Sequence, residues 1–359
     1  MNIHRPTLVL DPDRCLRNLK RMHSRATSAG TGFRPHFKTH QSIAIGRWFR
    51  EEGIDCITVS SLNMAEYFAG DGWDDILIAF ALNPLELERY NQLGSRCQLA
   101  TLIDNSEALE MIAGKLRQPL GFYVDIDTGY HRTGISPEDT GSIGEIIERA
   151  AEVDMLRFRG FYCHPGDTYK HLDRAAKEAI HARSIAALAT LKQRFSAHNP
   201  EVLMGDTPGC SLTESYPGVD AITPGNFIFY DLFQHSIGSC AEDDIAVAMA
   251  CPVVGRYPDR GEVVIHGGSA HFSKDAVSIG GQTVFGKLAA RSGSTWKQHT
   301  GDHYLYSLSQ EHGIIRLPAE EVRKVGIGDL LYFLPVHSCL TAIQMGEYLA
   351  TDGRVLDHM

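Results

Sequence analysis

The sequence contains several groups of residues whose types and spacing suit chemistry, and the first surrounds a lysine. In Arg34-Pro-His-Phe-Lys-Thr-His40, Lys38 stands between His36 and His40. Desolvation and neighbouring cationic groups can turn a lysine into a Schiff-base nucleophile and later a proton-transfer base. A solvated basic turn is the alternative that this segment leaves open.

Two further polar groups follow apolar runs. Val124-Asp-Ile-Asp-Thr-Gly-Tyr-His-Arg-Thr-Gly134 carries Arg132 in a glycine-containing loop, where its guanidinium fork would suit a carboxylate or a ring nitrogen. In Gly160-Phe-Tyr-Cys-His-Pro-Gly-Asp-Thr-Tyr169, Tyr162 and His164 are two positions apart, so a strand would direct both side chains to one face. An exposed loop charge and a hydrogen-bonded core histidine are the simpler explanations.

Two turns that contain glycine and proline predict a site for a small anion. They are Gly205-Asp-Thr-Pro-Gly-Cys-Ser211 and Thr223-Pro-Gly-Asn-Phe-Ile-Phe-Tyr-Asp231. Backbone amides at tight turns after the last strands of a barrel often bind phosphate. Ordinary turns are the alternative. The sequence has neither Gly-x-Gly-x-x-Gly nor Gly-x-x-x-x-Gly-Lys-Ser/Thr, which disfavours dinucleotide and nucleoside-triphosphate sites.

A histidine and a cysteine near the C-terminus have the spacing of metal ligands. In Phe333-Leu-Pro-Val-His-Ser-Cys-Leu-Thr341, His337 and Cys339 would point the same way from a strand or its end. An imidazole and a thiolate together suit Zn²⁺, and two protein ligands leave positions open for substrate. A buried cysteine beside a polar histidine is the alternative. In Ser309-Gln-Glu-His-Gly313, Glu311 or His312 would orient such a ligand through a hydrogen bond without binding the metal itself.

The elements that must position these groups follow a βα pattern up to about residue 230. Eight strands in a (β/α)₈ barrel would bring the polar groups to one end, and the remaining first strand would pair elsewhere, with the C-terminal domain. A helix from Asp173 to about Ala197 belongs to the outer layer. The candidate strands are Thr7–Asp11, Arg34–His40, Cys56–Ser61, Asp75–Leu82, Gln98–Asp104, Leu120–Asp127, Leu156–His164, Val202–Asp206 and Asp220–Phe229.

From about Ser239 the pattern changes to short alternating segments separated by Gly, Pro and Asp. This predicts a mostly antiparallel β-domain at 239–359 after a barrel at 1–238, with residues 1–11 available to pair with the β-domain. The alternating segments are Glu262–Ile265, Thr283–Phe285, His303–Leu308, Gly313–Leu317 and Asp329–Phe333.

Composition excludes several classes of function. The chain has 359 residues and a formal net charge of -10, which argues against a nucleic-acid surface. Its apolar stretches are shorter than the roughly 18 residues of a membrane span, and its first residues do not form a secretory signal, so we expect a cytoplasmic protein. The 8 cysteines form no Cys-x-x-Cys pair, and we expect most to be buried reduced thiols.

In this order along the chain, these motifs resemble the D-serine dehydratase and D-threonine aldolase family, which has the alanine racemase fold type. The shared motifs are Pro-His-Phe-Lys-Thr-His, Asp-Thr-Gly-x-x-Arg, Tyr-x-His-x-Gly, Thr-Pro-Gly-x-Ser, Pro-Gly-Asn-Phe-x-Phe-Tyr-Asp, Gln-Glu-His-Gly and His-Ser-Cys-Leu-Thr. The resemblance spans nearly the whole chain. One departure is Asp167, where the family pattern has Asn or His.

The resemblance implies a cofactor, a metal and a partner. Pyridoxal 5'-phosphate would be bound as a Schiff base on Lys38, and a divalent metal, zinc or else manganese or magnesium, would be held by His337 and Cys339. The family also implies a homodimer. The other residues expected at the cofactor are His36, Arg132, Tyr162, His164, Thr207, Gly209, Ser211, Gly225, Asn226 and Tyr230.

The resemblance implies a lyase for a small 3-hydroxy-D-amino acid. Lys38 would remove the α-proton, and the metal would make the hydroxyl a better leaving group, giving a 2-oxo acid and ammonia. The His-x-Cys motif and the Tyr-x-His-x-Gly-x-Thr-Tyr run favour the dehydratase branch. The alternative is retro-aldol cleavage by a D-threonine or 3-hydroxy-D-aspartate aldolase. A racemase and a non-catalytic cofactor carrier are further alternatives, and a carrier would leave the C-terminal metal motif without a use.

Overall fold

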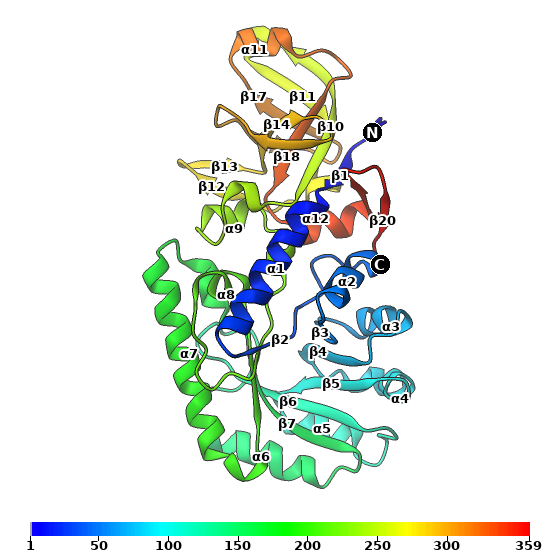
Figure 1. Cartoon of the computed structure of the whole chain (residues 1–359), viewed down its shortest axis with the longest axis vertical. Coiled ribbons are helices and arrows are strands. Elements are labelled where there is room, and N and C mark those ends of the chain that lie inside the picture. The colour runs from blue at the N-terminus through cyan, green and yellow to red at the C-terminus, as the bar shows by residue number, and fades with distance from the viewer. Residues whose placement is uncertain (1) are drawn as a thin grey trace. The chain divides into compact units, whose positions relative to one another are not determined.

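The chain divides into two compact units in the computed structural model, which describes residues 2–359 (Figure 1). We call residues 20–225 the barrel unit, and residues 2–19 together with 226–359 the β unit. The division comes at residues 225/226, so the segment 226–238, expected in the barrel, belongs to the β unit.

The barrel unit is built on a curled parallel sheet of eight strands in the order β2-β9-β8-β7-β6-β5-β4-β3. An isolated parallel bridge between His36 and Thr58 joins the segment after β2 to β3, at the other end of this order. The predicted α/β barrel architecture is therefore confirmed. The strands are β2 (Gly32–Phe33), β3 (Cys56–Val59), β4 (Asp75–Ala81), β5 (Gln98–Ile103), β6 (Leu120–Asp125), β7 (Leu156–Cys163), β8 (Glu201–Met204) and β9 (Ala221–Ile222).

Two of the predicted strands are wrong in their extent. The segment Arg34–His40 forms a bridge at His36 and then a turn, because the two-residue strand β2 ends before it. The predicted strand Asp220–Phe229 is reduced to β9, since Pro224 lacks an N–H for the ladder. Both errors fall where the chain leaves the sheet to form the candidate site.

Helices follow the strands of the barrel unit, and Figure 1 shows them along the outside of the sheet. Several begin at side-chain caps: Ser42, Ser61, Asn105 and Asp173 each accept a hydrogen bond from a backbone N–H of the first turn. The helices are α1 (Pro12–Ser28), whose first residues belong to the β unit, α2 (Ile43–Glu51), α3 (Leu62–Gly70), α4 (Leu87–Gly94), α5 (Ser106–Ile112), α6 (Thr140–Ala151), α7 (Arg174–Arg194) and α8 (Thr207–Leu212).

The inner face of the sheet carries one buried side chain from each of several strands. This cluster consists of Leu77, Leu102, Tyr123, Tyr162 and Leu203, which come from consecutive strands β4 to β8. Burying such side chains contributes roughly 1.5–3 kcal/mol each. The cluster thus joins five consecutive strands of the curled sheet through packed side chains.

The β unit is a ten-stranded sheet in the order β11-β17-β16-β14-β18-β10-β1-β19-β20, with β15 beside β14. Because β10 also pairs with β11, the strands from β11 to β10 close into a ring. The predicted antiparallel domain is confirmed. The strands are β1 (Thr7–Leu10), β10 (Val247–Tyr257), β11 (Glu262–His266), β14 (Gly286–Ser292), β15 (Thr295–Gln298), β16 (Tyr304–Leu308), β17 (His312–Arg316), β18 (Leu330–Pro335), β19 (Glu347–Ala350) and β20 (Val355–Asp357), with a separate hairpin of β12 (Val277–Ile279) and β13 (Gln282–Val284).

The N-terminal strand pairs within the β unit, as the sequence predicts. Residues Thr7 to Leu10 run antiparallel to β10 and parallel to β19. Short helices complete this unit: α9 (Leu232–Ser236), α10 (Ser269–Phe272), α11 (Ala319–Lys324) and α12 (Ser338–Met345). Within residues 2–359, no disulfide joins any of the 8 cysteines. Within residues 2–359, no helix has the length and apolar character of a membrane span.

Candidate active site

Lys38 lies in a turn that two histidine rings hold in place. Its backbone N–H donates to Nδ1 of His36 (3.3 Å), and the N–H of Ser42 donates to Nδ1 of His40 (3.1 Å). The side-chain amide of Gln41 donates to the carbonyl oxygen of Lys38 (3.1 Å). The histidines on either side of the lysine therefore shape its backbone, while the Lys38 side chain is partly exposed.

An aromatic cluster packs around Phe37, the residue that precedes Lys38 in this turn. The buried ring of Phe37 lies 4.8 Å from the ring of Phe49, 5.0 Å from Phe68 and 5.1 Å from Trp73, measured between centroids. Offset and edge-to-face pairs of this kind add to the stabilisation from area burial. The residue before Lys38 is thus anchored in the core, which limits the movement of the lysine backbone.

Lys38, Arg132, His36 and His164 interact electrostatically in one region of the barrel unit. Burial lowers the pKa of both histidines, and the positive charges of Lys38 and Arg132 lower it further, to about 4 for His164. Both rings are therefore neutral at neutral pH. Two cations beside two neutral rings form a site that favours anions.

The loop that carries Arg132 is held by a carboxylate. Asp127 accepts hydrogen bonds from the backbone N–H groups of Gly129 (2.9 Å) and His131 (3.0 Å). The Arg132 guanidinium lies 5.4 Å from the centre of the Tyr130 ring, and that ring lies 5.7 Å from the His164 ring. The Tyr130 ring thus lies between the Arg132 guanidinium and the His164 ring.

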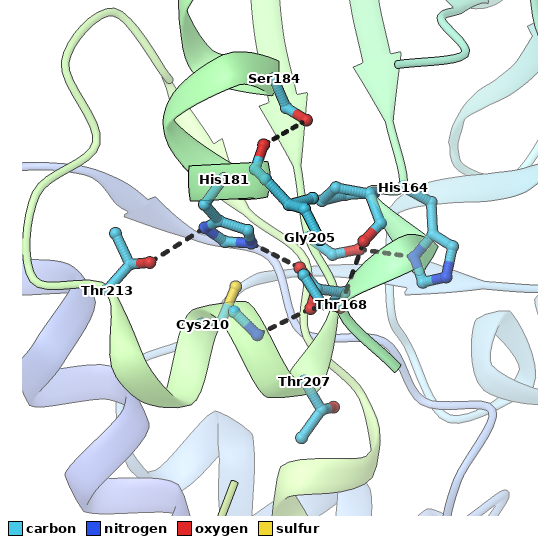
Figure 2. Close-up of polar contacts among 12 residues, drawn as sticks. His164, Thr168, His181, Ser184, Gly205, Thr207, Cys210 and Thr213 are labelled. Atoms are coloured by element: carbon cyan, nitrogen blue, oxygen red, sulfur yellow. Dashed lines mark hydrogen bonds and ion pairs between the residues drawn. The ribbon is translucent and has the colours of Figure 1, made fainter. Parts of the chain in front are cut away.

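Tyr162 and His164 leave the end of β7 with different roles. Tyr162 is buried in the inner cluster, and burial raises the pKa of its hydroxyl, so that the phenol stays protonated. Nδ1 of His164 donates to the carbonyl oxygen of Gly205 (2.7 Å), as Figure 2 shows. The Nε2 atom of the neutral His164 ring is then an acceptor.

The turn after β8 brings together Thr207, Gly209 and Ser211. Two of their donors have partners within the turn: the Gly209 N–H donates to Asp206 (2.7 Å), and the Ser211 hydroxyl donates to the Thr207 carbonyl (2.7 Å). The Thr207 N–H points to the Tyr169 hydroxyl (3.3 Å). Gly209 therefore contributes by the absence of a side chain rather than by its amide.

Gly225 is the last residue of the barrel unit and lies next to the turn that carries Lys38. A Cβ atom at this position would lie 3.1 Å from both Cβ and the carbonyl oxygen of His36. The His36 N–H donates to the carbonyl oxygen of Pro224 (2.9 Å), so the two segments run in close contact. The Gly225 turn and the Lys38 turn are thus neighbours, as expected for the two sides of one site.

Asn226 and Tyr230 belong to the β unit. The side-chain amide of Asn226 donates to Asp231 Oδ2 (2.9 Å), Ser338 Oγ (3.0 Å) and Cys339 Sγ (3.4 Å), while its buried Oδ1 has no donor among the described residues. Tyr230 is buried and has φ of 47°, a conformation rare for an aromatic residue. Through its hydrogen bonds, the Asn226 side chain links Asp231, Ser338 and Cys339 of the candidate metal site.

His337 and Cys339 lie at the beginning of helix α12, not on a strand. The strand β18 ends at Pro335, and His337 is the N-cap of the helix. Of the two predicted placements, a strand or its end, the pair follows the end of a strand, and the helix start brings the two side chains within hydrogen-bond contact. Burial opposes a charge on the His337 ring, but Cys339, Asp231 and Asp275 together raise its pKa to about 10. Surroundings that favour a cation this strongly fit a divalent metal ion.

Two carboxylates that the sequence analysis did not identify complete this region. Asp275 Oδ2 lies 2.8 Å from Nδ1 of His337. The buried Asp231 accepts hydrogen bonds from the N–H (3.1 Å) and hydroxyl (3.2 Å) of Ser338. Asp231 ends a motif quoted above, whereas Asp275 lies 62 positions before its partner and has no local motif to identify it.

The other residues considered from the sequence have local partners. Asp167 forms an ion pair with Lys170 (2.8 Å). The carboxylate of Glu311 lies 3.6 Å from His266 Nε2 and 3.8 Å from His271 Nε2. His312 Nδ1 contacts the hydroxyl of Ser309 (3.3 Å).

Comparison with known proteins identifies the family. The model of the alanine racemase N-terminal domain matches residues 10–232, and that of the putative serine dehydratase domain matches residues 246–351. The chain belongs to the serine dehydratase group of alanine racemase-like proteins. The family depends on pyridoxal phosphate, which confirms that cofactor class.

Three relatives of this serine dehydratase group illustrate its range. D-threo-3-hydroxyaspartate dehydratase of a Delftia species is 30% identical, over 99% of this chain and 96% of its own. D-serine dehydratase of Dictyostelium discoideum is also 30% identical, over 99% and 96%. 3-Hydroxy-D-aspartate aldolase of Paracoccus denitrificans is 29% identical, over 64% and 61%. All are lyases, which confirms the predicted enzyme class.

The solved structure of the Delftia dehydratase has the same fold. It superimposes with a TM-score of 0.92 at 29% identity, covering 100% of this chain and 98% of the other. Two variants of D-threo-3-hydroxyaspartate dehydratase also have solved structures. One replaces a histidine and the other replaces a cysteine two positions later, and the cysteine variant is in a metal-free form. His337 and Cys339 have the same spacing.

Proposed function

We propose that this protein is a pyridoxal-phosphate- and metal-dependent dehydratase of a 3-hydroxy-D-amino acid, of the D-serine dehydratase type. It would remove water from the substrate and yield a 2-oxo acid and ammonia. The two dehydratases that match nearly the whole chain favour this reaction. Retro-aldol cleavage to glycine and an aldehyde is the alternative, supported by the aldolase relative.

Lys38 would hold the cofactor through Nζ and act as the base for the substrate. When bound, pyridoxal phosphate supplies an electron sink for the charge that develops at the α-carbon. Lys38 then accepts the α-proton at Nζ. Phe37 is anchored in the aromatic cluster and the Lys38 N–H donates to Nδ1 of His36, and both contacts keep the lysine backbone in one position. The two cations beside two neutral rings fit a ligand that carries a phosphate and a carboxylate.

Arg132, Tyr162 and His164 would face the ring or its substituents. The charge of Arg132 suits a carboxylate, the protonated hydroxyl of Tyr162 is a donor, and neutral His164 offers an acceptor at Nε2. The phosphate would lie against the two glycine turns, at Thr207, Gly209, Ser211, Gly225 and Asn226, with Tyr230 nearby. Gly209 would contribute through its missing side chain, because its N–H already donates to Asp206.

His337 and Cys339 would hold the metal, and this is the observation that carries the proposal of a metal-assisted elimination. The His337 ring is anchored at Nδ1 by Asp275, which leaves Nε2 for an ion. Held by these two residues, a divalent ion would supply Lewis-acid polarisation of the departing hydroxyl group. Imidazole and thiolate ligands favour zinc, with manganese or magnesium as alternatives. We also propose a homodimer, by analogy with the family.

Metal removal tests this proposal. Purified enzyme would be treated with a chelator, freed of it, and assayed for oxo-acid formation from D-serine before and after addition of Zn²⁺, Mn²⁺ or Mg²⁺. We expect activity to disappear while the visible absorption of the cofactor persists, and to return with the ion that the site prefers. Undiminished activity in metal-free protein would assign His337 and Cys339 a structural role.

A further inference from the structure

A buried histidine in helix α7 contacts the turn after β8 from the side of the helix layer. Nε2 of His181 lies 2.5 Å from Oδ1 of Asp206, and its Nδ1 lies 3.1 Å from the Thr213 hydroxyl. His181 has no exposed surface, and Asp206 is 2% exposed. Figure 2 shows the ring between the helix and the turn.

Asp206 uses its other oxygen to fix both sides of the turn. Oδ2 accepts hydrogen bonds from the Gly209 N–H (2.7 Å) and from the Thr168 hydroxyl (2.6 Å). Burial alone would raise the pKa of Asp206, but the charge and hydrogen bond of His181 and these donors lower it. The carboxylate is therefore ionised and fully hydrogen-bonded, an arrangement that rigidifies a buried polar network.

The nearby Cys210 does not make this cluster a metal site. Its ligand atom and those of His181 and Asp206 all lie within 4.8 Å of one another. The His181 nitrogen is in direct contact with the carboxylate, however, and both oxygens of Asp206 already have donors. Burial also raises the pKa of the Cys210 thiol, which keeps it protonated. The cluster is a hydrogen-bonded pair of an imidazole and a carboxylate that acts on the backbone around it.

The backbone of the turn is fitted to the His181 ring. A Cβ atom on Gly209 would lie 1.9 Å from His181 Nε2, so only glycine allows this approach. On the preceding side, the Gly205 carbonyl accepts the hydrogen bond that orients His164. The His181–Asp206 pair thus lies between the turn that carries Thr207 and the residue that sets the direction of His164.

We propose that His181 is a positioning residue for the phosphate group of the cofactor: with Asp206 it holds the Gly205–Ser211 turn in its binding conformation. This inference rests on the proposed pyridoxal-phosphate function. His181 itself does not contact the cofactor in this account. It acts through Asp206, and its loss should affect ligands that carry the phosphate more than ligands that lack it.

The test compares two ligands that differ only in the phosphate. Cofactor-free wild-type protein, His181→Ala and His181→Gln would be titrated with pyridoxal phosphate and with pyridoxal, following the visible absorption. In His181→Ala we expect the dissociation constant for pyridoxal phosphate to rise about 10- to 100-fold, the value of one or two charge-assisted hydrogen bonds, with that for pyridoxal nearly unchanged. His181→Gln keeps a donor for Asp206 and should fall between.

Ser184→Ala is the matched control. Ser184 is buried in the same helix and bonds to the Thr128 hydroxyl (2.7 Å) and the Ile180 carbonyl (3.0 Å), not to Asp206. The Ser184→Ala variant should bind pyridoxal phosphate and pyridoxal with the affinities of the wild type. If His181→Ala does not fold, His181→Gln alone decides, since it retains the buried donor.

The outcomes are distinct. An equal loss of affinity for pyridoxal and pyridoxal phosphate would show a general structural role and overturn the inference, as would an unchanged affinity for both. Failure of the wild-type protein to bind pyridoxal phosphate at all would overturn the proposed function and with it this inference.

Discussion

Nδ1 of His337 lies 2.8 Å from Oδ2 of Asp275, a carboxylate in another segment of the β unit. A carboxylate at one ring nitrogen fixes the orientation of the imidazole and increases the basicity of the other nitrogen. The pair therefore prepares His337 to bind an ion through Nε2, beside Cys339.

Replacing Asp275 by Ala should weaken metal binding without removing a ligand. Loss of such a partner typically lowers metal affinity 10- to 100-fold. Competition titrations of the variant with a chelating indicator and Zn²⁺ would measure the change. Asp275→Asn retains an acceptor for the ring and should lose less. Wild-type affinity in Asp275→Ala would contradict the role given to this pair.

Lys38→Ala should abolish covalent attachment of the cofactor and reduce turnover by at least the roughly 10²- to 10⁴-fold that general acid–base catalysis contributes. Loss of the visible absorption band after dialysis would report the attachment, and oxo-acid formation would report the activity. Lys170→Ala is the control, because this exposed lysine pairs with Asp167 and should retain both properties. A persistent band in Lys38→Ala would refute the assignment.

The depressed pKa of His164 predicts a stability that depends on pH. The unfolded chain takes up a proton near the ordinary value of 6.5, whereas the folded protein does so only at about 4, so stability rises with pH between these values. His164 should therefore account for a loss of roughly 2 kcal/mol between pH 7 and pH 5. Urea unfolding of cofactor-free wild type and His164→Asn at both values would measure it. An equal loss in both proteins would contradict the prediction.

A buried ion pair in the β unit should be costly to break. Lys287 Nζ lies 2.8 Å from Glu242 and 2.9 Å from Asp302, and both Lys287 and Glu242 are largely buried. Lys287→Ala would leave the Glu242 charge uncompensated, which costs about 3–5 kcal/mol in the free energy of unfolding. Lys297→Ala, at an exposed position of the same sheet, should change it by less than about 0.5 kcal/mol.

The alternation of apolar runs and helical segments predicts the strands of the barrel because their side chains must fill both faces of a covered sheet. The same reasoning extends the strand too far at Arg34–His40. There, hydrogen bonds from the backbone to the rings of His36 and His40 replace the strand ladder. Local propensity gives no indication of such side-chain caps.

Only part of the candidate metal site can be predicted from the sequence. Residue types and spacing predict His337 and Cys339 as a pair, although a helix N-terminus rather than a strand presents them. Asp275 and Asp231 become neighbours of the pair only through tertiary folding. The sequence pattern likewise does not distinguish His181 from the other polar residues of an outer helix. Its contact with Asp206 forms only in the folded chain.

Product analysis of the holoenzyme tests the central claim most directly. Purified protein with its cofactor and metal would be incubated with D-serine, D-threonine and 3-hydroxy-D-aspartate, and the oxo acid, ammonia, glycine and aldehyde would be quantified. A dehydratase should yield oxo acid and ammonia in equal amounts from at least one of these substrates, with no glycine. Glycine and an aldehyde in equal amounts, without oxo acid, would contradict the elimination reaction.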